Sequence, residues 1–439
     1  MNPLNALEAL TQSLPVNRWE IEVSGKVCEV SPSYLKVKGL SSGVNLGDQV
    51  SYLRVNGATA YGEVIRVEQD SVIVKPYTAR TDIGLGTKVT RQGVLSFRPD
   101  ESWRGRIIDA RGRPIDNLGP LKQGCSSVLF DAPPPQAISR SRVTKAARTG
   151  IRAIDLFTPM CHGQRLGIFA GSGVGKSTTL SMIARSNDFD TVVIGLIGER
   201  GREVREFIEE TLGDQLGKSV VVVATGDESS MMRRLAPKTA VTLAEYFRDK
   251  GQAVLLVLDS ITRYAHALRD VALAAGEPAL SRGYPPSVFA DLPALLERTG
   301  PGMDGSGTIT AVFSVLVDGD DHNDPVADNI RGLLDGHIVL DRHIAEEGRY
   351  PAMNLLSSVS RLAHHAWSPQ ERELVLKLRS MVARFEDTKD LRMMGGYKAG
   401  TDAFLDQAIE LVPKLYRALT QPQNAPASRD AFTELAQLL

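Results

Sequence analysis

The chain has 439 residues, and its 51 lysines and arginines nearly balance 52 aspartates and glutamates, for a formal net charge of −1. This length predicts two or three domains, and the balanced charge argues against a basic nucleic-acid-binding surface over the whole chain. The three cysteines are scattered and lack C-x-x-C spacing, which argues against a zinc site and favours a reducing compartment. The apolar runs are too short to span a membrane and the N-terminus lacks a secretory pattern, so we expect a cytoplasmic protein.

Residues 1–18 are predicted to form an amphipathic tether. Leucines recur at helical spacing in this segment, before Pro15: Leu4, Leu7, Leu10 and Leu14. A helix of this length is not stable alone, so it must dock on another surface. Packing on its own domain and tethering a partner or a surface are equally open at this point.

Residues 19–93 predict a small N-terminal antiparallel β-barrel. Alternating or β-branched runs are separated here by turns rich in glycine, asparagine and aspartate: Glu20–Val27, Tyr34–Val37, Gln49–Val55, Tyr61–Gln69 and Ser71–Pro76. Some barrels of this kind bind oligonucleotides, but no aromatic residues alternate with lysine or arginine here. A structural or ring-forming role is therefore favoured, and no nucleic-acid partner is expected.

Residues 94–365 predict an α/β domain. Residues 94–145, rich in glycine and proline, are interpreted as a connector, and strand-like and helix-like stretches alternate after them. The expected strands are Arg165–Phe169, Thr191–Ile197, Ser219–Ala224, Ala253–Leu258, Thr308–Val317 and His337–Leu340, with helices such as Glu203–Leu212 and Ala236–Lys250 between them. Such alternation indicates a mostly parallel sheet, in which ligands bind beyond the carboxyl ends of the strands.

Residues 366–439 have a helical pattern and predict a C-terminal helical domain. The expected helices are Pro369–Arg384, Thr401–Thr420 and Ser428–Leu438. A glycine-rich turn, GGYKAG at residues 395–400, separates the first helix from the second.

The stretch Ala170–Thr178 reads AGSGVGKST and lies between a predicted strand and a predicted helix, Leu180–Ser186. Glycines let backbone N–H groups approach an anion, and the helix N-terminus adds a partial positive charge. Lys176 supplies a charge for the β- and γ-phosphates, and Ser177 supplies a hydroxyl for Mg²⁺. The residues expected to bind a nucleoside triphosphate are Gly171, Ser172, Gly173, Val174, Gly175, Lys176, Ser177 and Thr178. The stretch departs from the P-loop pattern at Ala170, where a glycine is usual.

Two carboxylates follow predicted strands of the same domain. Asp259 ends the apolar run Leu255–Leu258, where a carboxylate can hold Mg²⁺ through a water. Glu199 follows another strand, where it can polarise the attacking water of a hydrolysis reaction. Arg200, the next residue, is expected to orient Glu199 or the phosphates.

Two further residues are weaker candidates on sequence alone. Arg361 follows a serine-rich strand end, as an arginine finger that stabilises phosphoryl-transfer charge would. Tyr350, before a proline, offers an aromatic face on which adenine could stack.

Taken together, these motifs resemble the rotary-ATPase family, and most closely the ATPases of flagellar and type III protein export. The resemblance covers nearly all of the chain. Besides AGSGVGKST, it is carried by TGIRAID (Thr149–Asp155), GERGREVREF (Gly198–Phe207), LLVLDSITRYA (Leu255–Ala265), the long stretch at 276–300, GDDHNDPVADNIRGLLDGHIVL (Gly319–Leu340), RYPAMN (Arg349–Asn354) and SSVSR (357–361).

The resemblance implies a RecA-like P-loop ATPase core and assigns the site residues. Lys176, Ser177, Glu199 and Asp259 match the phosphate, Mg²⁺ and water-activating positions, Tyr350 matches the adenine-stacking position, and Arg361 matches an arginine supplied by the neighbouring subunit. Because one chain holds both the water-activating residue and the finger, a homohexamer with six equivalent sites is the simplest arrangement.

The resemblance also implies partners. A coiled-coil regulator would bind the N-terminal segment, and a central coiled-coil stalk protein would sit in the pore. The C-terminal helices would face the membrane export gate and chaperone–substrate complexes, which places the protein in the cytoplasm, peripherally at the inner membrane.

The resemblance predicts that the protein hydrolyses ATP and couples this reaction to delivery or unfolding of flagellar export substrates. Four alternatives stay open: a virulence secretion ATPase, a rotary ATP synthase catalytic subunit, an RNA-translocating hexamer like Rho, and a scaffold that binds nucleotide without turnover. The fragment FEDTKD at residues 385–390 is less acidic than the corresponding loop of synthase subunits, which disfavours the synthase.

Overall fold

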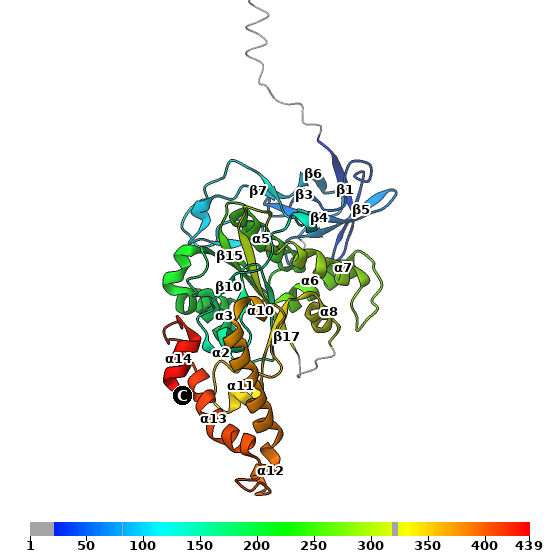
Figure 1. Cartoon of the computed structure of the whole chain (residues 1–439). Coiled ribbons are helices and arrows are strands. Elements are labelled where there is room, and N and C mark those ends of the chain that lie inside the picture. Colours follow the sequence, from blue (N-terminus) through cyan, green and yellow to red (C-terminus); the bar gives the residue numbers. More distant parts are fainter. Residues whose placement is uncertain (1–21, 81, 318–323) are drawn as a thin grey trace, which may run out of the picture. The chain divides into compact units, whose positions relative to one another are not determined.

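The structure, a computed structural model, describes residues 22–80, 82–317 and 324–439. The chain divides into an N-terminal unit that ends at Leu95 and a larger unit that begins at Ser96 (Figure 1). The predicted tether, residues 1–18, lies outside the described residues, as does the start of the predicted strand Glu20–Val27. Among the described residues, no helix is long and apolar enough to cross a membrane.

The N-terminal unit is a closed antiparallel barrel, as predicted. Its strands follow the order β1-β2-β5-β4-β3-β6. They are β1 (Ser24–Val30), β2 (Leu35–Lys38), β3 (Asp48–Leu53), β4 (Thr59–Val67), β5 (Ser71–Pro76) and β6 (Lys88–Val94). Strand β6 was not predicted, because Val89 is its only fully buried apolar residue and the strand therefore shows little alternation.

The larger unit is built on a mixed, mainly parallel sheet with the order β19-β18-β12-β17-β15-β13-β14-β8. All six strands predicted for this sheet form, with ends within one residue of those expected. The strands are β8 (Ile107–Asp109), β12 (Arg165–Ala170), β13 (Thr191–Ile197), β14 (Ser219–Ala224), β15 (Ala253–Asp259), β17 (Thr308–Leu316), β18 (Gly336–Leu340) and β19 (Val359–Ser360), with β16 (Gly300–Pro301) beside β17. The small strands β7 (Ser96–Phe97), β9 (Val128–Leu129), β10 (Ala146–Ala147) and β11 (Met160–Cys161) pair outside it.

The segment 94–145 is more than a connector. It contributes β8, which pairs in parallel with β14 at the edge of the main sheet. Three residues between glycine- and proline-rich stretches are too few to show a strand pattern, so tertiary pairing decides this element. Two short 3₁₀ helices, Glu101–Trp103 and Ala137–Ser139, also lie in this segment.

Helices cover the sheet and extend from it. They are α2 (Arg152–Phe157), α3 (Lys176–Ala184), α4 (Gly201–Glu206), α5 (Ser230–Arg248), α6 (Ile261–Ala274), α7 (Pro286–Glu297), α8 (Pro325–Leu333), α9 (Arg342–Glu346) and α10 (Ala363–Ala366). Helix α5 begins earlier than predicted, because the Ser229 side chain caps it by accepting a hydrogen bond from the Met232 N–H.

The prediction of a helix over Glu203–Leu212 is wrong in part. Helix α4 ends at Glu206, and a π-helical turn, Phe207–Leu212, and a 3₁₀ turn, Gly213–Lys218, follow it. The apolar side chains in this stretch recur at spacings of three and four residues, which α- and π-helical turns both accommodate.

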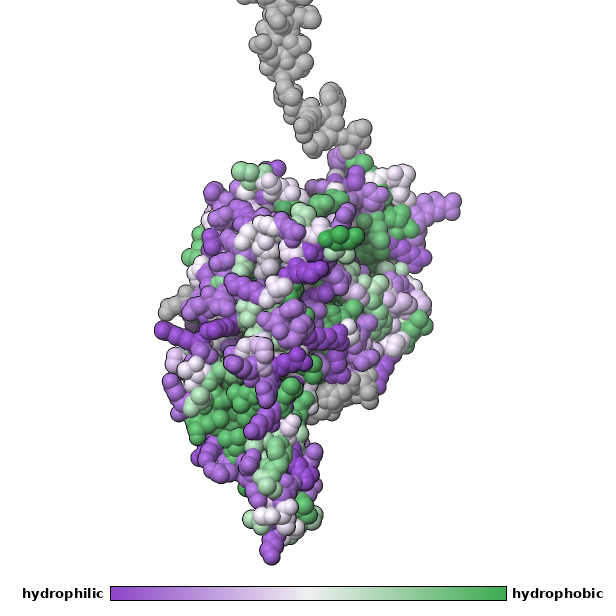
Figure 2. Space-filling view, in the orientation of Figure 1, coloured by the Kyte–Doolittle hydropathy of each residue, from purple (hydrophilic) through white to green (hydrophobic). Residues whose placement is uncertain are grey.

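The C-terminal region is helical, as predicted. Its helices are α11 (Pro369–Asp387), α12 (Lys389–Met393), α13 (Ala403–Leu419) and α14 (Ala431–Leu438). Helices α11 and α13 pack against each other, and α12 lies at the far end of this pair (Figure 1). Hydrophobic side chains gather over the C-terminal helices on the face shown in Figure 2. Leu438 and Leu439 are exposed at the end of this region.

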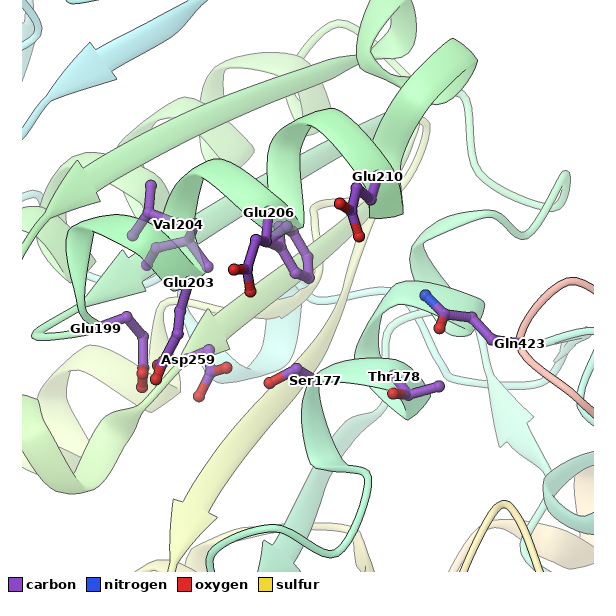
Figure 3. A pocket seen from close by; sticks show the side chains of 11 residues that line it. Ser177, Thr178, Glu199, Glu203, Val204, Glu206, Glu210, Asp259 and Gln423 are labelled. Atoms are coloured by element: carbon purple, nitrogen blue, oxygen red, sulfur yellow. The ribbon is translucent and has the colours of Figure 1, made fainter.

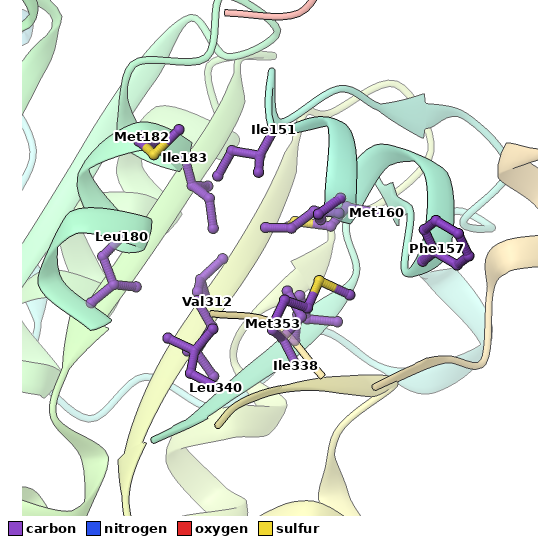
Figure 4. Close-up of a cluster of buried hydrophobic side chains, with 14 of the residues drawn as sticks. Ile151, Phe157, Met160, Leu180, Met182, Ile183, Val312, Ile338, Leu340 and Met353 are labelled. Atoms are coloured by element: carbon purple, nitrogen blue, oxygen red, sulfur yellow. The ribbon is translucent and has the colours of Figure 1, made fainter. Parts of the chain in front are cut away.

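One continuous core supports the phosphate loop from behind. Leu180 and Ile183 of α3 face the sheet residues Val312 and Leu340 in Figure 4, and all four are buried. The same cluster continues into α11 and α13, for example through Val375 of α11. The helix that begins at the phosphate loop is therefore held by apolar packing against the sheet, within a core that extends to the C-terminal helices.

Candidate active site

The phosphate loop connects β12 to α3, as the sequence predicted. Gly173 and Gly175 have φ values of 79° and 86°, which other residues rarely adopt. A Cβ on Gly175 would also lie 3.2 Å from the Tyr350 ring. The N–H groups of the first turn of α3 have no side-chain cap, so they are available to an anion in the loop.

Lys176, the first residue of α3, meets Asp259, the last residue of β15, beside the carboxyl ends of the strands. The Lys176 ammonium donates to the Asp259 carboxylate and, at 3.2 Å, to the Ser314 hydroxyl of β17. Ser314 in turn donates to Oδ1 of Asp259 at 2.7 Å. This buried network fixes the orientation of the Asp259 carboxylate beside the phosphate loop.

Glu199 lies just beyond β13, close to this network. Its Oε1 atom is 3.9 Å from the Lys176 ammonium and 3.4 Å from Nε of Arg263, and it has no hydrogen-bond partner among the described residues. Burial and the nearby charge of Asp259 raise the pKa of Glu199 from 4.5 to about 7, although Lys176 and Arg263 act in the opposite direction. A carboxyl group with this pKa can orient a water molecule and exchange protons near neutral pH.

Arg200 is not placed against Glu199. Its side chain is 81% exposed and its nearest carboxylate is that of Glu203, at 3.7 Å. Arg263 of α6 occupies the position expected for Arg200, and it also donates to the Gly198 carbonyl. Sequence reasoning missed Arg263, although it lies one helical turn after Asp259 and β15 neighbours β13.

A cavity of about 230 Å³ opens beside the phosphate loop (Figure 3). Ser177 and Asp259 line it together with Glu199 and Glu203. The lining also includes Thr178, Leu196, Val204, Glu206, Phe207, Glu210 and Gln423. Sequence reasoning did not single out Glu203, whose only signal was its place one helical turn after Glu199.

These oxygen groups suit a hard divalent cation. The Ser177 hydroxyl and the Asp259 and Glu203 carboxylates are the ligand types that Mg²⁺ accepts. In the described part of the chain, no three His, Cys, Asp or Glu side chains form a ready metal site. The arrangement therefore fits Mg²⁺ that keeps several waters and shares its coordination with bound phosphates.

Tyr350 lies against the phosphate loop, where the sequence had suggested it. Its ring is next to Gly175, and the residue is 39% exposed. Its carbonyl accepts a hydrogen bond of 2.8 Å from the N–H of Gln421, so the segment after α13 also reaches this site. An exposed aromatic face beside the phosphate loop can stack on a nucleobase.

Arg361 lies at the edge of the sheet formed by the amino ends of the strands, opposite the edge that carries the phosphate loop. Its N–H donates to the Asp335 carbonyl, and Ser360 pairs with Gly336 at the amino end of β18. The phosphate loop instead follows the carboxyl end of β12, which runs parallel to β18. The length of β12 alone, about 17 Å, separates the two edges, so the exposed Arg361 cannot reach the phosphate loop of its own chain.

Comparisons with known proteins identify the family of this chain. Residues 150–360 match the family model of the ATP synthase alpha/beta family, nucleotide-binding domain, and residues 367–437 match that of the T3SS EscN ATPase C-terminal domain. The flagellum-specific ATP synthase of Rhizobium meliloti is 56% identical, over 99% of this chain and 93% of that protein. The type 3 secretion system ATPase of Xanthomonas euvesicatoria is 41% identical, over 94% of this chain and 92% of that protein.

Two solved structures of the assembled ATPase EscN from the type III secretion system of enteropathogenic E. coli are similar to this chain. The TM-score is 0.88 for the structure without the central stalk EscO and 0.86 for the complex with it. They are 37% and 36% identical to this chain, and each comparison covers 94% of this chain and 99% of that one. The similarity therefore extends through all the domains of both proteins, and the predicted resemblance is confirmed. This chain belongs to the family of flagellum-specific ATP synthases and type 3 secretion system ATPases, and the site built on its phosphate loop is that of an ATPase.

Proposed function

We propose that this chain hydrolyses Mg-ATP in a homohexameric ring and couples the reaction to delivery and unfolding of flagellar export substrates at the membrane gate. The higher identity to the flagellar relative, 56% against 41% for the secretion relative, favours flagellar over virulence export. Assembly of EscN, a protein similar over 94% of this chain, supports a ring.

The residues around the cavity have different roles in hydrolysis. Backbone N–H groups of the loop and Lys176 hold the phosphates, and Ser177 and Asp259 hold Mg²⁺, which neutralises charge on the phosphate oxygens when bound. Glu199 orients the attacking water and accepts its proton. Tyr350 stacks on adenine, and Arg263 holds Glu199 in place in the role first expected of Arg200.

The position of Arg361 carries the proposal of a ring. Because Arg361 lies at the amino edge of the sheet and the loop at the carboxyl edge, one chain supplies two halves of a site that it cannot close itself. A head-to-tail ring brings the Arg361 edge of one subunit to the loop edge of the next. There the guanidinium stabilises the charge that develops on the transferred phosphoryl group.

The ring is expected to bind several partner proteins. The complex of EscN with its central stalk supports a coiled-coil stalk in the pore of the ring. The exposed leucines at the end of α14 support contacts of the C-terminal helices with the export gate or with chaperone–substrate complexes. Residues 1–18 would bind a coiled-coil regulator, and the protein would act in the cytoplasm, at the surface of the inner membrane.

Mixing two inactive variants tests the shared site. Glu199→Gln lacks the water-orienting carboxylate but keeps Arg361, and Arg361→Ala keeps an intact loop side. In a mixed ring assembled at a one-to-one ratio, about one quarter of the interfaces combine the two intact halves. Steady-state ATPase activity should therefore recover to about a quarter of the wild-type rate when the two variants are mixed.

The control mixture is Glu199→Gln with Lys176→Ala, which leaves no intact loop side and should stay inactive. If the first mixture also stays inactive while sizing shows mixed rings, Arg361 does not act in a neighbouring subunit and the proposal fails. Addition of RNA should leave the rate unchanged, whereas stimulation would favour a nucleic-acid motor.

A further inference from the structure

Arg349, the residue before Tyr350, points into the C-terminal helices and not towards the phosphate loop. Its guanidinium carbon lies 3.9 Å from the centre of the Tyr416 ring, on α13. Its Nε and Nη2 atoms donate to the Glu347 carboxylate at 2.9 Å and 2.8 Å. The aromatic face under the guanidinium and the Oε2 atom of Glu347, which accepts from both nitrogens, together hold the side chain in one orientation.

Tyr416 is itself held by a second helix. Its hydroxyl donates to the Glu386 carboxylate of α11 at 2.6 Å, and its ring packs at a steep angle near Phe385. Burial and the adjacent Glu386 raise the pKa of Tyr416, so the phenol keeps its proton and the hydrogen bond persists. Arg349 therefore rests on a ring that α11 and α13 fix from two directions.

The backbone of Tyr350 is attached to the same region. Its carbonyl accepts from the N–H of Gln421, and the buried Gln421 side chain donates to the Gly150 carbonyl and accepts from the Arg152 N–H. The contacts of Arg349 and Gln421 thus lie on either side of the α-carbon that carries the Tyr350 ring. By contrast, the phosphate loop contacts the Tyr350 ring through Gly175, which has no side chain to hold the ring in place.

We propose that Arg349 is a positioning residue for the nucleobase: seated on Tyr416, it sets the place of the Tyr350 ring over the phosphate loop. This inference rests on the proposed stacking of adenine on Tyr350. The C-terminal helices, rather than the loop, then decide how well the base is bound, while the phosphate contacts through Lys176 are independent of Arg349.

The experiment compares a ligand that has a base with one that lacks it. KM and kcat for ATP and the inhibition constant of inorganic tripolyphosphate are measured for wild type, Arg349→Met and Arg349→Lys. A partly buried cation on an aromatic ring contributes enough to binding that KM for ATP should rise about fivefold in Arg349→Met. The inhibition constant of tripolyphosphate and kcat should stay within about twofold, and Arg349→Lys, which keeps a cation, should restore part of the affinity.

The matched control is Arg342→Met, which removes an exposed arginine of α9 and should leave KM unchanged. The double variant Arg349→Met/Tyr350→Ala should bind ATP no more weakly than Tyr350→Ala alone, because Arg349 acts through that ring. An unchanged KM in Arg349→Met, or an equal loss of ATP and tripolyphosphate affinity, would overturn the inference. If Arg349→Met were too unstable to assay, Tyr416→Leu, which removes the aromatic face under Arg349, provides the same comparison.

The Tyr350→Ala variant separates this inference from the proposed stacking. If Tyr350→Ala leaves KM for ATP unchanged, the proposed adenine contact is wrong. If Tyr350→Ala raises KM and Arg349→Met does not, the adenine contact stands and only the role of Arg349 is refuted.

Discussion

Replacing Glu199 by glutamine should abolish turnover and at the same time stabilise the folded protein at alkaline pH. In the native state the pKa of Glu199 rises from 4.5 to about 7, chiefly through burial. A carboxyl group whose pKa is raised by folding destabilises the fold once pH exceeds its unfolded value. The cost grows from about pH 4.5 and is complete above about pH 7.

The magnitude follows from the shift. A difference of about 2.5 pKa units corresponds to about 3 kcal/mol of unfolding free energy at pH 8. Glutamine has nearly the same shape and carries no charge, so Glu199→Gln avoids this cost at every pH. Its Tm should exceed that of wild type by a few degrees at pH 8, and the difference should disappear near pH 5.

Three measurements on the same variant check the reasoning. ATPase turnover should fall at least about a hundredfold, because the group that orients the water and accepts its proton is lost. Binding of a fluorescent ATP analogue should persist, since Lys176 and Ser177 are intact. Thermal denaturation at pH 5 and pH 8 reports the stability difference, with Glu209→Gln, an exposed glutamate paired to Arg205, as the matched control. Wild-type turnover would refute the role of Glu199, and equal Tm differences at both pH values would refute its raised pKa.

Two further predictions concern arginines. The kcat/KM of wild type should rise with pH up to about 7 as Glu199 loses its proton. Arg263→Gln should move this rise to higher pH by about one unit, because a cation 3.4 Å from Glu199 is lost. Arg200→Gln should leave the pH profile unchanged, and a shift in that variant instead would restore the role first expected of Arg200. Arg298→Met should lower the free energy of unfolding by about 3–5 kcal/mol in denaturant melts, because it leaves the buried Glu245 without the two hydrogen bonds of 3.1 Å and 2.6 Å that it now accepts. Replacing Glu245 by leucine in the same chain should recover most of that loss, and no recovery would show that packing rather than charge is responsible.

The sequence by itself determined the features that depend on near neighbours. The phosphate loop follows from three glycines at alternate positions, Lys176 and Ser177 between a strand and a helix, and the buried strands follow from short apolar runs. These signals are local because backbone conformation and burial pattern are set within a few residues. The candidate residues Asp259 and Glu199 could be found for the same reason, since each follows such a strand directly.

The tertiary structure alone decided which of these residues meet. The raised pKa of Glu199 depends on its burial and on Asp259, which is its neighbour only because β13 and β15 pair in parallel. The same pairing brings Arg263, and not the adjacent Arg200, to Glu199. Contacts between residues far apart in the chain depend on strand order and helix packing, which no local pattern encodes. For this reason the seat of Arg349 on Tyr416 and the separation of Arg361 from the phosphate loop emerged only from the fold.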